Sequence, residues 1–558
     1  MSDTRAGAAA VSSRPLTGWS IIRRTSRRLL VGIGLSVGGL AAIAGTLLAA
    51  APGGAAAALR PRCARHFPPV IRDGFPEPPM RFSHRGRLDT TLRASVSRVT
   101  IAGRRYRTMN YEGVYPSPTL VVCPGDRLAV HLINHLPQGT NLHLHGFHVT
   151  PRGAGDNVFL DIRPGRKFTY RYRLPLDLPP GAYWYHPHLH TLVEPQIFAG
   201  MAGAIVVQGG LDDRLPRIPQ RLVVLTNTQL GSNGQTVPAA TSKDRDARLL
   251  VNGALNPTAK IRPGEIQRWR IFNANADRIV VLRLQAHRLE LLAQDGNTLP
   301  AMRRTQDLTI PPSSRREILV RGGRSGSYAM QALPFTQRPG GQLPAQTVLT
   351  LRSGGRRVHD RMPTGALSHP VDLRRRRADR HRRIEFSSVP RAGGPPEFLL
   401  NHQAFDPHRV AVTMKLGSVE QWTLVNTTTE WHTFHIHINP FQLIIHNGRR
   451  LKSVDYRDNV NLAPKSSTVV RMRPVDFTGK FVIHCHVTFH EDHGMMAAVQ
   501  VLARPSPSQL RASAVRTPHM SIRSSAWGSS AIPPEARTTI QFVCRLLGIN
   551  ATPPASRG

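Results

Sequence analysis

Four histidine pairs constrain this chain more than any other feature of its sequence. Two pairs lie in the first third of the 558 residues and two near the end: His143-Leu144-His145, His186-Pro187-His188, His435-Ile436-His437 and His484-Cys485-His486. Side chains at positions i and i+2 of a β-strand point to the same face, so each pair offers two imidazoles to one side. Eight imidazoles presented in this way are enough to bind a cluster of several metal ions.

A second metal site is predicted on the opposite face of the same strands. Cys485 lies between two paired histidines and must point away from both. His432 precedes His435 by an odd number of positions, so its side chain must also point to the face opposite that pair. One thiolate, two imidazoles (His432 and His490) and the thioether of Met495 form the ligand set of a blue-copper electron-transfer centre. A structural zinc, the alternative, takes four ligands and would leave most of these side chains unexplained.

Short stretches in which apolar and polar residues alternate, separated by turns, predict an all-β fold. Gly and Pro, 46 of each, supply many turns. A turn, an acidic residue, an apolar strand and an asparagine recur at roughly 140-residue spacing, and the three repeats end at Asn134, Asn273 and Asn426. We therefore predict three related β-sandwich or barrel domains, at 80–209, 215–352 and 384–504.

The two ends of the chain are predicted to lie outside these domains. Arg27 and Arg28 precede an apolar stretch over 29–50 and an Ala-rich region that reaches Ala58. This pattern resembles a twin-arginine signal, so 1–58 is predicted to direct export to the periplasm or the extracellular space. An uncleaved membrane anchor is the alternative, because the apolar stretch is long enough to span a bilayer. The tail 505–558 is rich in Ser, Pro and Arg and is predicted to be loosely packed.

Three cysteines remain when Cys485 is assigned to the metal site: Cys63, Cys123 and Cys544. Export favours their oxidation, and they allow one disulfide with one cysteine left over. A Cys63–Cys544 bridge would tie two peripheral segments together, but Cys123 could replace either partner.

The net charge of +40 raises the question of an anionic partner. The basic residues are spread along the whole chain, so we expect no nucleic-acid partner. One cluster is dense: Arg374 to Arg377 with Arg380, Arg382 and Arg383. We predict that it belongs to a solvated linker over 353–383 that could adsorb to an anionic polymer or surface. The protein is expected to be a monomer.

These motifs together resemble the three-domain multicopper oxidases, the family of laccases, bilirubin oxidases and bacterial copper-resistance oxidases. The resemblance covers about residues 80–504. It implies three cupredoxin-like Greek-key domains, a middle domain without copper ligands, and four copper ions, one of type 1, one of type 2 and two of type 3. The ligands it implies are Cys485, His432, His490 and Met495 for type 1, His143 and His435 for type 2, and His145, His186, His188, His437, His484 and His486 for the type 3 pair.

Two acids lie beside these motifs and resemble the groups that relay protons to dioxygen in the family. Glu491 follows His490, and Asp156 follows the first histidine pair. The alternative for each is a carboxylate that only stabilises the fold. Asp492 is predicted to face solvent and to return protons to Glu491. His148, His190 and His493 are interpreted as neighbours of the site, since the ligand set is complete without them.

The reaction implied is the one-electron oxidation of a reducing substrate, with Cys485 on the electron path, coupled to four-electron reduction of dioxygen to water. A laccase-like oxidation of phenols or aromatic amines is the leading hypothesis. Oxidation of Cu(I), Fe(II) or Mn(II) is the alternative, although the 12 Met residues form no Met-rich insert of the kind that Cu(I) oxidases carry. An inactive cupredoxin scaffold is disfavoured because every ligand is present.

Overall fold

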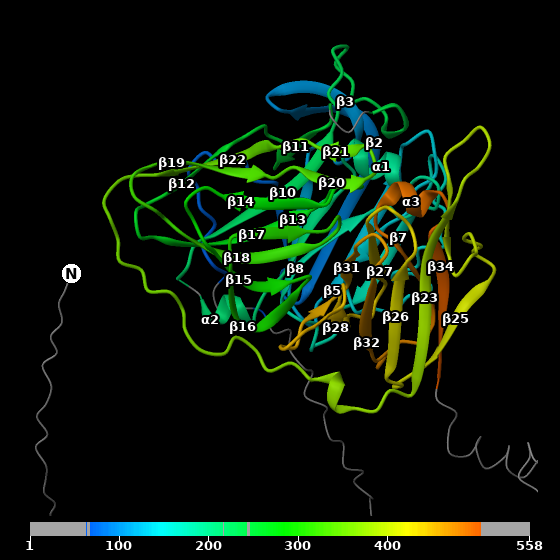
Figure 1. Cartoon of the computed structure of the whole chain (residues 1–558). Helices are drawn as coiled ribbons and strands as arrows, with labels where there is room; N and C mark the ends of the chain where they lie inside the picture. The colour runs from blue at the N-terminus through cyan, green and yellow to red at the C-terminus, as the bar shows by residue number, and fades with distance from the viewer. Residues whose placement is uncertain (1–62, 64–66, 216, 243–245, 504–558) are drawn as a thin grey trace, which may run out of the picture. The chain divides into compact units, whose positions relative to one another are not determined.

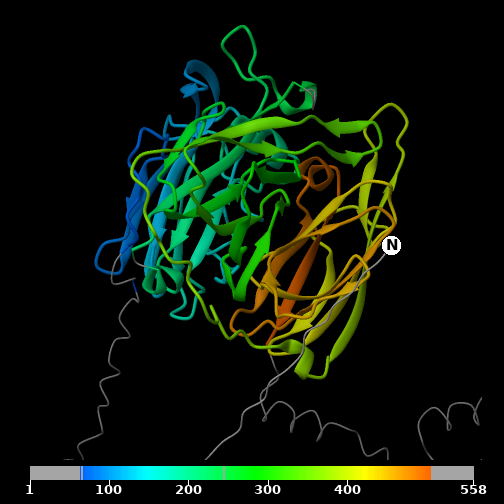
Figure 2. The same ribbon diagram turned by 60° about the vertical axis from the view of Figure 1, so that its left-hand side comes forward.

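The computed structural model describes residues 63, 67–215, 217–242 and 246–503, which belong to one compact unit. Almost all regular structure in them is β, arranged as three pairs of sheets (Figures 1 and 2). The strands of the three pairs extend over 80–207, 220–353 and 380–502, and the pairs are called here the first, second and third sandwich. The all-β fold of three cupredoxin-like domains is confirmed.

The first sandwich contains a five-stranded and a four-stranded sheet. In spatial order the larger sheet is β1 (Met80–Phe82), β4 (Ser117–Val122), β9 (Gly203–Val207), β8 (Gly181–His186) and β6 (His143–His145). The smaller sheet is β3 (Arg104–Tyr111), β2 (Arg87–Ile101), β5 (Arg127–Asn134) and β7 (Lys167–Arg173). Helix α1 (Val193–Ala199) precedes β9, and α2 (Leu211–Arg214) follows it.

The second sandwich has a six-stranded and a five-stranded sheet. The larger is β11 (Arg248–Val251), β10 (Gln220–Thr228), β13 (Ile266–Asn273), β18 (Arg315–Arg321), β15 (Leu289–Gln294) and β16 (Asn297–Thr305). The smaller is β12 (Thr258–Ile261), β22 (Gln346–Ser353), β19 (Gly326–Ala332), β14 (Val280–Leu284) and β17 (Asp307–Ile310). A hairpin of β20 (Phe335–Arg338) and β21 (Gly341–Leu343), and the 3₁₀ turn η1 (Ala239–Thr241), complete it.

The third sandwich carries the short helix α3 (Thr488–Asp492). One sheet is β24 (Glu397–Leu400), β23 (Arg380–Val389), β26 (Glu420–Asn426), β32 (Ser467–Met472), β28 (Phe441–His446) and β29 (Arg449–Arg450), with β30 (Tyr456–Arg457) on β28. The other is β25 (Val410–Lys415), β34 (Met496–Leu502), β33 (Gly479–Cys485), β27 (His432–Ile436) and β31 (Asn459–Leu462).

The sequence repeat corresponds to a repeat in topology. Strands β5, β13 and β26 each pair in parallel with the strand on one side and antiparallel with the strand on the other. The asparagine that ends each strand donates its side-chain amide to main-chain carbonyls on two neighbouring segments: Asn134 to Gln138 and Ile162, Asn273 to Arg278, Ile310 and Pro311, and Asn426 to Glu430, Leu462 and Ala463. The repeated asparagine therefore holds the loop that follows its strand against a neighbouring segment in all three sandwiches, because its amide donates to main-chain carbonyls of both.

Each sandwich encloses its own apolar core. Along β5, Leu128, Val130 and Leu132 are buried while the residues between them are more exposed, as the alternation of the sequence predicts. The equivalent strands contribute Trp269 to the second core and Trp422 to the third. Among the described residues, no helix is long and apolar enough to cross a membrane.

The predicted basic linker does not extend to residue 383, although five of the seven clustered arginines are exposed: Arg375, Arg376, Arg377, Arg380 and Arg383. Strand β23 begins at Arg380, so three of the arginines lie on a paired strand, and Arg382 forms an ion pair with Glu420. Before it, a 3₁₀ turn η2 (Leu373–Arg375) buries Leu373, and Arg374 bonds to Asp372. Three of the seven arginines form ion pairs, Arg374 with Asp372, Arg382 with Glu420 and Arg383 with Glu385, which the arginine run alone does not reveal.

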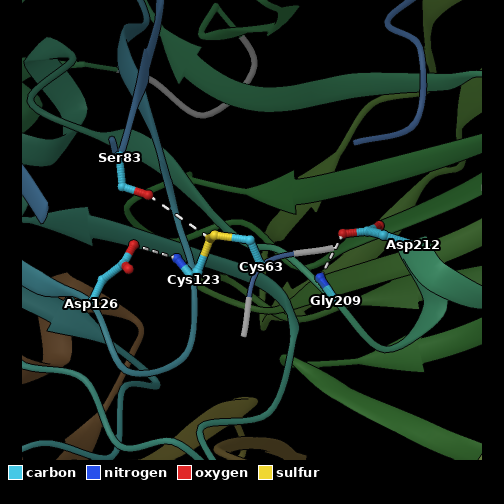
Figure 3. The surroundings of a disulfide bond; sticks show 6 residues. All are labelled: Cys63, Ser83, Cys123, Asp126, Gly209 and Asp212. Carbon is cyan, nitrogen blue, oxygen red and sulfur yellow. Dashed lines mark hydrogen bonds between the residues drawn. A yellow bond between two sulfur atoms is a disulfide. The ribbon is translucent and has the colours of Figure 1, made fainter. Parts of the chain in front are cut away.

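One disulfide joins Cys63 to Cys123, and Cys485 is not part of a disulfide (Figure 3). Cys123 follows β4, and its main-chain N–H donates to Asp126 in the turn before β5. The bridge therefore attaches the segment before the first sandwich to that turn. Cys544, the tail 505–558 and the predicted signal segment 1–58 lie outside the described residues.

Candidate metal centre

The eight paired histidines come together between the first and third sandwiches. Strand β6 pairs with β8 so that His143 lies opposite His186, and β27 pairs with β33 so that His435 lies opposite His484. Antiparallel pairing thus sets two histidine pairs side by side in each sandwich. All eight side chains are buried: His143, His145, His186, His188, His435, His437, His484 and His486.

Two groups of three imidazole nitrogens converge. The Nε2 atoms of His188, His437 and His484 lie 3.1 to 3.2 Å from one another. In the second group, which consists of His145, His186 and His486, His186 Nε2 lies 3.4 Å from His145 Nδ1. Each group mixes imidazoles of the first and third sandwiches, so neither sandwich could form it alone.

The remaining two imidazoles, those of His143 and His435, lie next to both groups. Their ring centroids are 5.9 Å apart, and neither Nε2 atom has a hydrogen-bond partner. The His143 ring stacks on His437 and the His435 ring stacks on His145, with centroids 3.9 and 3.8 Å apart. Two buried ring nitrogens without a partner are costly unless they bind something.

Hydrogen bonds on the outer side of the rings determine which nitrogen is free to bind a metal. The Nδ1 atoms donate to carbonyl oxygens or a carboxylate: His186 to Pro187 at 2.8 Å, His484 to Cys485 at 3.1 Å, His435 to Asp458 at 2.8 Å, and His143 to Asp156 at 2.9 Å. Since these acceptors require an N–H group, the inner Nε2 atom of each ring carries a lone pair. This arrangement is typical of metal-binding histidines, whose outer nitrogen is held by a second residue.

Burial makes these imidazoles neutral. It lowers the pKa of His188 to about 4 and that of His484 to about 3, and neighbouring imidazoles oppose a positive charge on the other rings as well. A cluster of neutral imidazoles with inward lone pairs fits metal cations well. The residues present therefore match the donor set that a copper cluster requires.

Cys485 and two further histidines form a separate group on the other face of β27 and β33. The Cys485 sulfur lies 3.5 Å from His432 Nδ1 and 3.6 Å from His490 Nδ1, and these two nitrogens are 3.0 Å apart. The main chain of Met495 bonds to Cys485 and His490, and its side chain is fully buried in the third core. The parity argument from the sequence thus predicted this separation of faces.

The electrostatics of this second group also fit a metal. Burial raises the pKa of Cys485 to about 12, so a thiolate here needs a cation beside it. The outer nitrogens are again held, His432 Nε2 by the Thr428 hydroxyl at 2.8 Å and His490 Nε2 by Glu430 at 3.1 Å. Both Nδ1 atoms are thereby left to face the sulfur.

The two predicted proton-relay acids are buried beside the imidazoles. Glu491 Oε2 lies 2.9 Å from His484 Nδ1, and Asp156 accepts bonds from His143 Nδ1 and from the N–H of Leu144. Burial raises the pKa of each carboxyl to about 7. Both are in place to hold a proton next to the imidazole cluster.

We predicted that Asp492 faces solvent, and this prediction is wrong. Its carboxylate is partly buried and accepts bonds from the main-chain N–H groups of Val193 and Glu194 at the start of α1. No side chain within α1 caps that end, so a residue distant in sequence does so. The prediction failed because helix capping across sandwiches leaves no local sequence signal.

The three histidines interpreted as neighbours of the site, His148, His190 and His493, make contacts with residues other than the proposed ligands. His148 bonds to the carbonyl of Ile438 and to Asp476, and His493 Nδ1 lies 2.7 Å from the carbonyl of Phe489. The His190 ring packs on Phe405. These contacts agree with their interpretation as neighbours of the site.

Sequence reasoning missed four residues that contact the metal-binding side chains or surround them. Thr428 and Glu430 hold the His432 and His490 rings, and Asp458, which bonds to His145, is itself held by Arg315 of the second sandwich. Thr428 and Glu430 precede His432 by four and two positions, which is a weak local signal. The other two lie on segments without any motif.

A pocket reaches the His490 ring from outside. It lies where the β20–β21 hairpin of the second sandwich meets the third, and it is lined by Asp277, Arg278, Gln337, Arg338, Gly341, Leu343, Glu430, Val487, Phe489 and His490. The lining carries both carboxylates and guanidiniums. A small molecule bound there would be close to the second metal group.

Comparisons with known proteins agree with this geometry. Three family models described as multicopper oxidase match residues 93–211, 182–355 and 369–505. The multicopper oxidase mco of Staphylococcus haemolyticus is 24% identical over 433 residues, covering 75% of this chain and 89% of that protein. A laccase of Bacillus stratosphericus is 26% identical over 468 residues, covering 70% and 90%.

A solved structure shows the same fold. It is the multicopper oxidase of Campylobacter jejuni, described as a metallo-oxidase, with a TM-score of 0.67, 25% identity, and coverage of 79% of this chain and 99% of that one. Together with the family models and the two imidazole-rich groups, this shows that the chain belongs to the multicopper oxidase family of copper-dependent oxidoreductases.

Proposed function

We propose that the chain oxidises phenols or aromatic amines by one electron at a time, in a laccase-like reaction, and reduces dioxygen to water. Four substrate electrons and four protons convert one dioxygen molecule into two waters. One observation carries the proposal: the Cys485 sulfur belongs to one ligand group, while its chain neighbours His484 and His486 belong to the two imidazole groups. That arrangement offers a short covalent path for electrons between two sites.

The proposed ligand assignment follows the grouping of the donor atoms. Four copper ions would be held in all. Type 1 would take Cys485, His432, His490 and Met495, type 2 would take His143 and His435, and the type 3 pair would take His145, His186 and His486 on one side and His188, His437 and His484 on the other. When bound, the copper ions supply one-electron redox chemistry and a binding site for dioxygen.

The pocket at His490 has a volume of only about 30 Å³, so a small organic reductant would lie at its mouth rather than inside it. Glu430 contacts the His490 ring and its side chain is 27% exposed, so it is placed to accept the proton that a phenol loses on oxidation. Arg278 and Arg338 also line the pocket and offset the charges of Asp277 and Glu430, so the lining carries no net negative charge to attract a bare metal cation. Glu491 and Asp156 are proposed to hold the protons that water formation consumes.

A metallo-oxidase of Cu(I), Fe(II) or Mn(II) is the second candidate. Asp277 and Glu430 both line the pocket, and carboxylates are the ligands that a hard cation prefers. The Campylobacter jejuni relative is described as a metallo-oxidase. Oxygen uptake by the copper-loaded protein, measured first with a phenol and then with each metal ion, separates the two. Uptake with none of them would support an inactive scaffold and would overturn both candidates.

The high positive charge has a structural counterpart outside the predicted linker. Arg87, Arg127 and Arg173 stand in register across β2, β5 and β7, and Arg171 lies beside them in the same groove. Arg87 is paired with Asp89, and no ion pair is formed by the other three within the described residues. Like charges opposite one another on neighbouring strands are unfavourable unless an anion lies between them. We propose that this arginine row, rather than residues 374–383, attracts an anionic polymer. We also propose export through segment 1–58.

A further inference from the structure

The second sandwich supplies none of the clustered imidazoles, yet one of its side chains reaches them. Arg315 at the start of β18 is fully buried. It forms a bidentate ion pair with Asp458, in which Nη1 donates to Oδ1 at 2.9 Å and Nη2 donates to Oδ2 at 2.6 Å. Asp458 precedes β31 of the third sandwich and is buried as well. We propose that the Arg315–Asp458 pair positions His145 and His435 for copper, which makes the second sandwich part of the metal centre.

Asp458 holds the outer nitrogens of two imidazoles at once. Its Oδ1 atom lies 3.3 Å from His145 Nε2, and its main-chain carbonyl accepts from His435 Nδ1 at 2.8 Å. The two rings stack, with centroids 3.8 Å apart and planes at 18°. The side chain of the next residue, Asn459, also lies 3.1 Å from His145 Nε2. Asp458 therefore contacts a ring of the first sandwich, together with Asn459, and a ring of the third. These contacts leave His145 Nδ1 and His435 Nε2 to face the cluster.

Arg315 is itself fixed by contacts to the first and second sandwiches. Its Nε atom donates to the carbonyl of Ala182 on β8, the strand that ends at His186. Its Nη1 atom also donates to the carbonyl of Ser313, and its main-chain N–H donates to Asp295. Because the guanidinium is planar and its donors are in fixed directions, these bonds fix the position of the Asp458 carboxylate.

The ion pair also explains the glycine that follows His145. Gly146 has a φ of +83°, and a Cβ atom there would collide with Asp458 Oδ2 and Arg315 Nη2. The pair thus packs directly against the chain at the end of the first histidine pair. A glycine that looks like a turn residue in the sequence is needed because two charged side chains occupy the space of a side chain.

Charge compensation gives the pair a second role. Asp458 contributes a negative charge in contact with His145, and Arg315 cancels it in a buried environment. Removing the guanidinium alone would leave an unpaired carboxylate against a metal ligand, whereas removing both charges would leave a neutral pair of similar volume. If charge compensation matters, removing Arg315 alone should disturb the metal site more than removing both charges. Loss of packing alone predicts the opposite order.

The inference rests on the proposed copper site, so the test begins with the wild-type protein. The variants are Arg315→Met, Arg315→Lys, Asp458→Asn and the double variant Arg315→Met/Asp458→Asn. Arg268→Met is the matched control, because Arg268 is also buried in ion pairs of the second sandwich, with Asp212 and Glu317. Copper per chain, electron paramagnetic resonance of the copper outside the type 1 site, blue absorption and the midpoint of thermal unfolding are measured for each.

Arg315→Met should keep the blue absorption but weaken copper binding at the imidazole cluster about 10- to 100-fold, the usual effect of losing a residue that holds a ligand. The resonance spectrum of the remaining copper should change, with partial recovery in Arg315→Lys and in the double variant. Arg268→Met should lower the unfolding midpoint and leave copper content and spectrum unchanged.

Wild-type copper content and spectrum in Arg315→Met would overturn the inference, as would equal changes in Arg268→Met. If Arg315→Met does not accumulate as folded protein, Arg315→Lys decides, because it keeps the charge and loses the two-pronged geometry. An unchanged spectrum in Arg315→Lys would then overturn the inference. A wild-type protein that binds copper only at Cys485 would overturn the proposed function instead.

Discussion

The carboxylate of Glu430 lies 3.1 Å from Nε2 of His490, on the ring edge opposite the one that faces Cys485. The hydrogen bond from His490 lowers the pKa of Glu430 and keeps it ionised. The Glu430 side chain is 27% exposed and that of His490 only 3%, so a molecule in the pocket meets the carboxylate before the ring. The two residues together form the polar entrance to the type 1 site that we propose.

Glu430→Gln should slow the oxidation of a phenol about 10²-fold in kcat/KM, because the amide cannot accept the phenolic proton. Ferrocyanide releases no proton on oxidation, so its rate should not fall. Steady-state oxygen uptake with both donors measures this difference. Equal rates for the phenol in variant and wild type would show that Glu430 only holds the His490 ring.

Cys485→Ser should remove the strong blue absorption and abolish turnover, since Cys485 provides the thiolate that we propose for type 1 copper. The copper held by the eight imidazoles should remain, which metal analysis can count. The double variant Cys63→Ser/Cys123→Ser is the matched control, because it removes two other cysteines and the disulfide between them. Blue absorption in Cys485→Ser would contradict the assignment.

The sequence predicted the fold class from its repeats and the separation of the Cys485 site from the imidazole cluster from residue parity. The finer grouping of the imidazoles was implied only by the family resemblance, because each His-x-His pair is divided between groups. The asparagine repeat marked the same strand in each sandwich. These are local patterns, and a strand preserves them regardless of the rest of the chain.

What the sequence did not reveal depends on contacts between segments far apart. Arg315 and Asp458 are 143 positions apart, and neither lies in a motif. Asp492 caps a helix about 300 positions earlier. The arginine run did not reveal that Arg382 is in an ion pair, because its partner Glu420 lies on another strand. Ion pairs and caps of this kind are determined by the tertiary structure.

Glu77 should make stability depend on pH. Burial raises the pKa of this carboxyl to about 8, so the folded protein favours its protonated form. A raised carboxyl pKa contributes stability below the unfolded value near 4.5, and that contribution is lost as pH rises to about 8. Glu77→Gln stays neutral and should therefore exceed the wild type in unfolding free energy by at least about 1 kcal/mol at high pH.

Urea unfolding at pH 5 and pH 8.5 tests this, with the exposed Asp161→Asn as the control variant. The difference between Glu77→Gln and the wild type should grow with pH, and that between Asp161→Asn and the wild type should stay nearly constant. A difference that is the same at both pH values would show that Glu77 does not carry the dependence.

The arginine row should bind anionic polymer more strongly than other basic segments. The triple variant Arg127→Ser/Arg171→Ser/Arg173→Ser removes three arginines that form no ion pair within the described residues. Its retention on an immobilised polyanion should fall most at low salt, because exposed charges act over about 10 Å at 0.1 M salt. Arg356→Ser/Arg357→Ser/Arg361→Ser loses the same charge from an exposed segment and is the control. Equal loss of retention in both variants would show that only net charge matters.

The last prediction concerns the protons that water formation consumes at a buried site. Glu491 is fully buried, its Oε2 atom lies 2.9 Å from His484 Nδ1, and Asp156 occupies the corresponding place beside His143. Glu491→Gln keeps the size of the side chain and removes the transferable proton. We expect it to retain all bound copper and the blue absorption, and reduction by substrate should be nearly unchanged because that step takes no proton from Glu491.

Reoxidation by dioxygen should instead slow about 10²–10⁴-fold, the usual contribution of a positioned acid. Stopped-flow mixing of the fully reduced protein with dioxygen measures this step alone, and Asp156→Asn in parallel separates the two acids. Asp156 accepts the bonds of His143 Nδ1 and the N–H of Leu144, so its variant should also alter copper binding. Glu491→Gln should not, because His484 Nδ1 keeps its bond to the Cys485 carbonyl. Wild-type reoxidation in Glu491→Gln with slow reoxidation in Asp156→Asn would assign the proton path to Asp156.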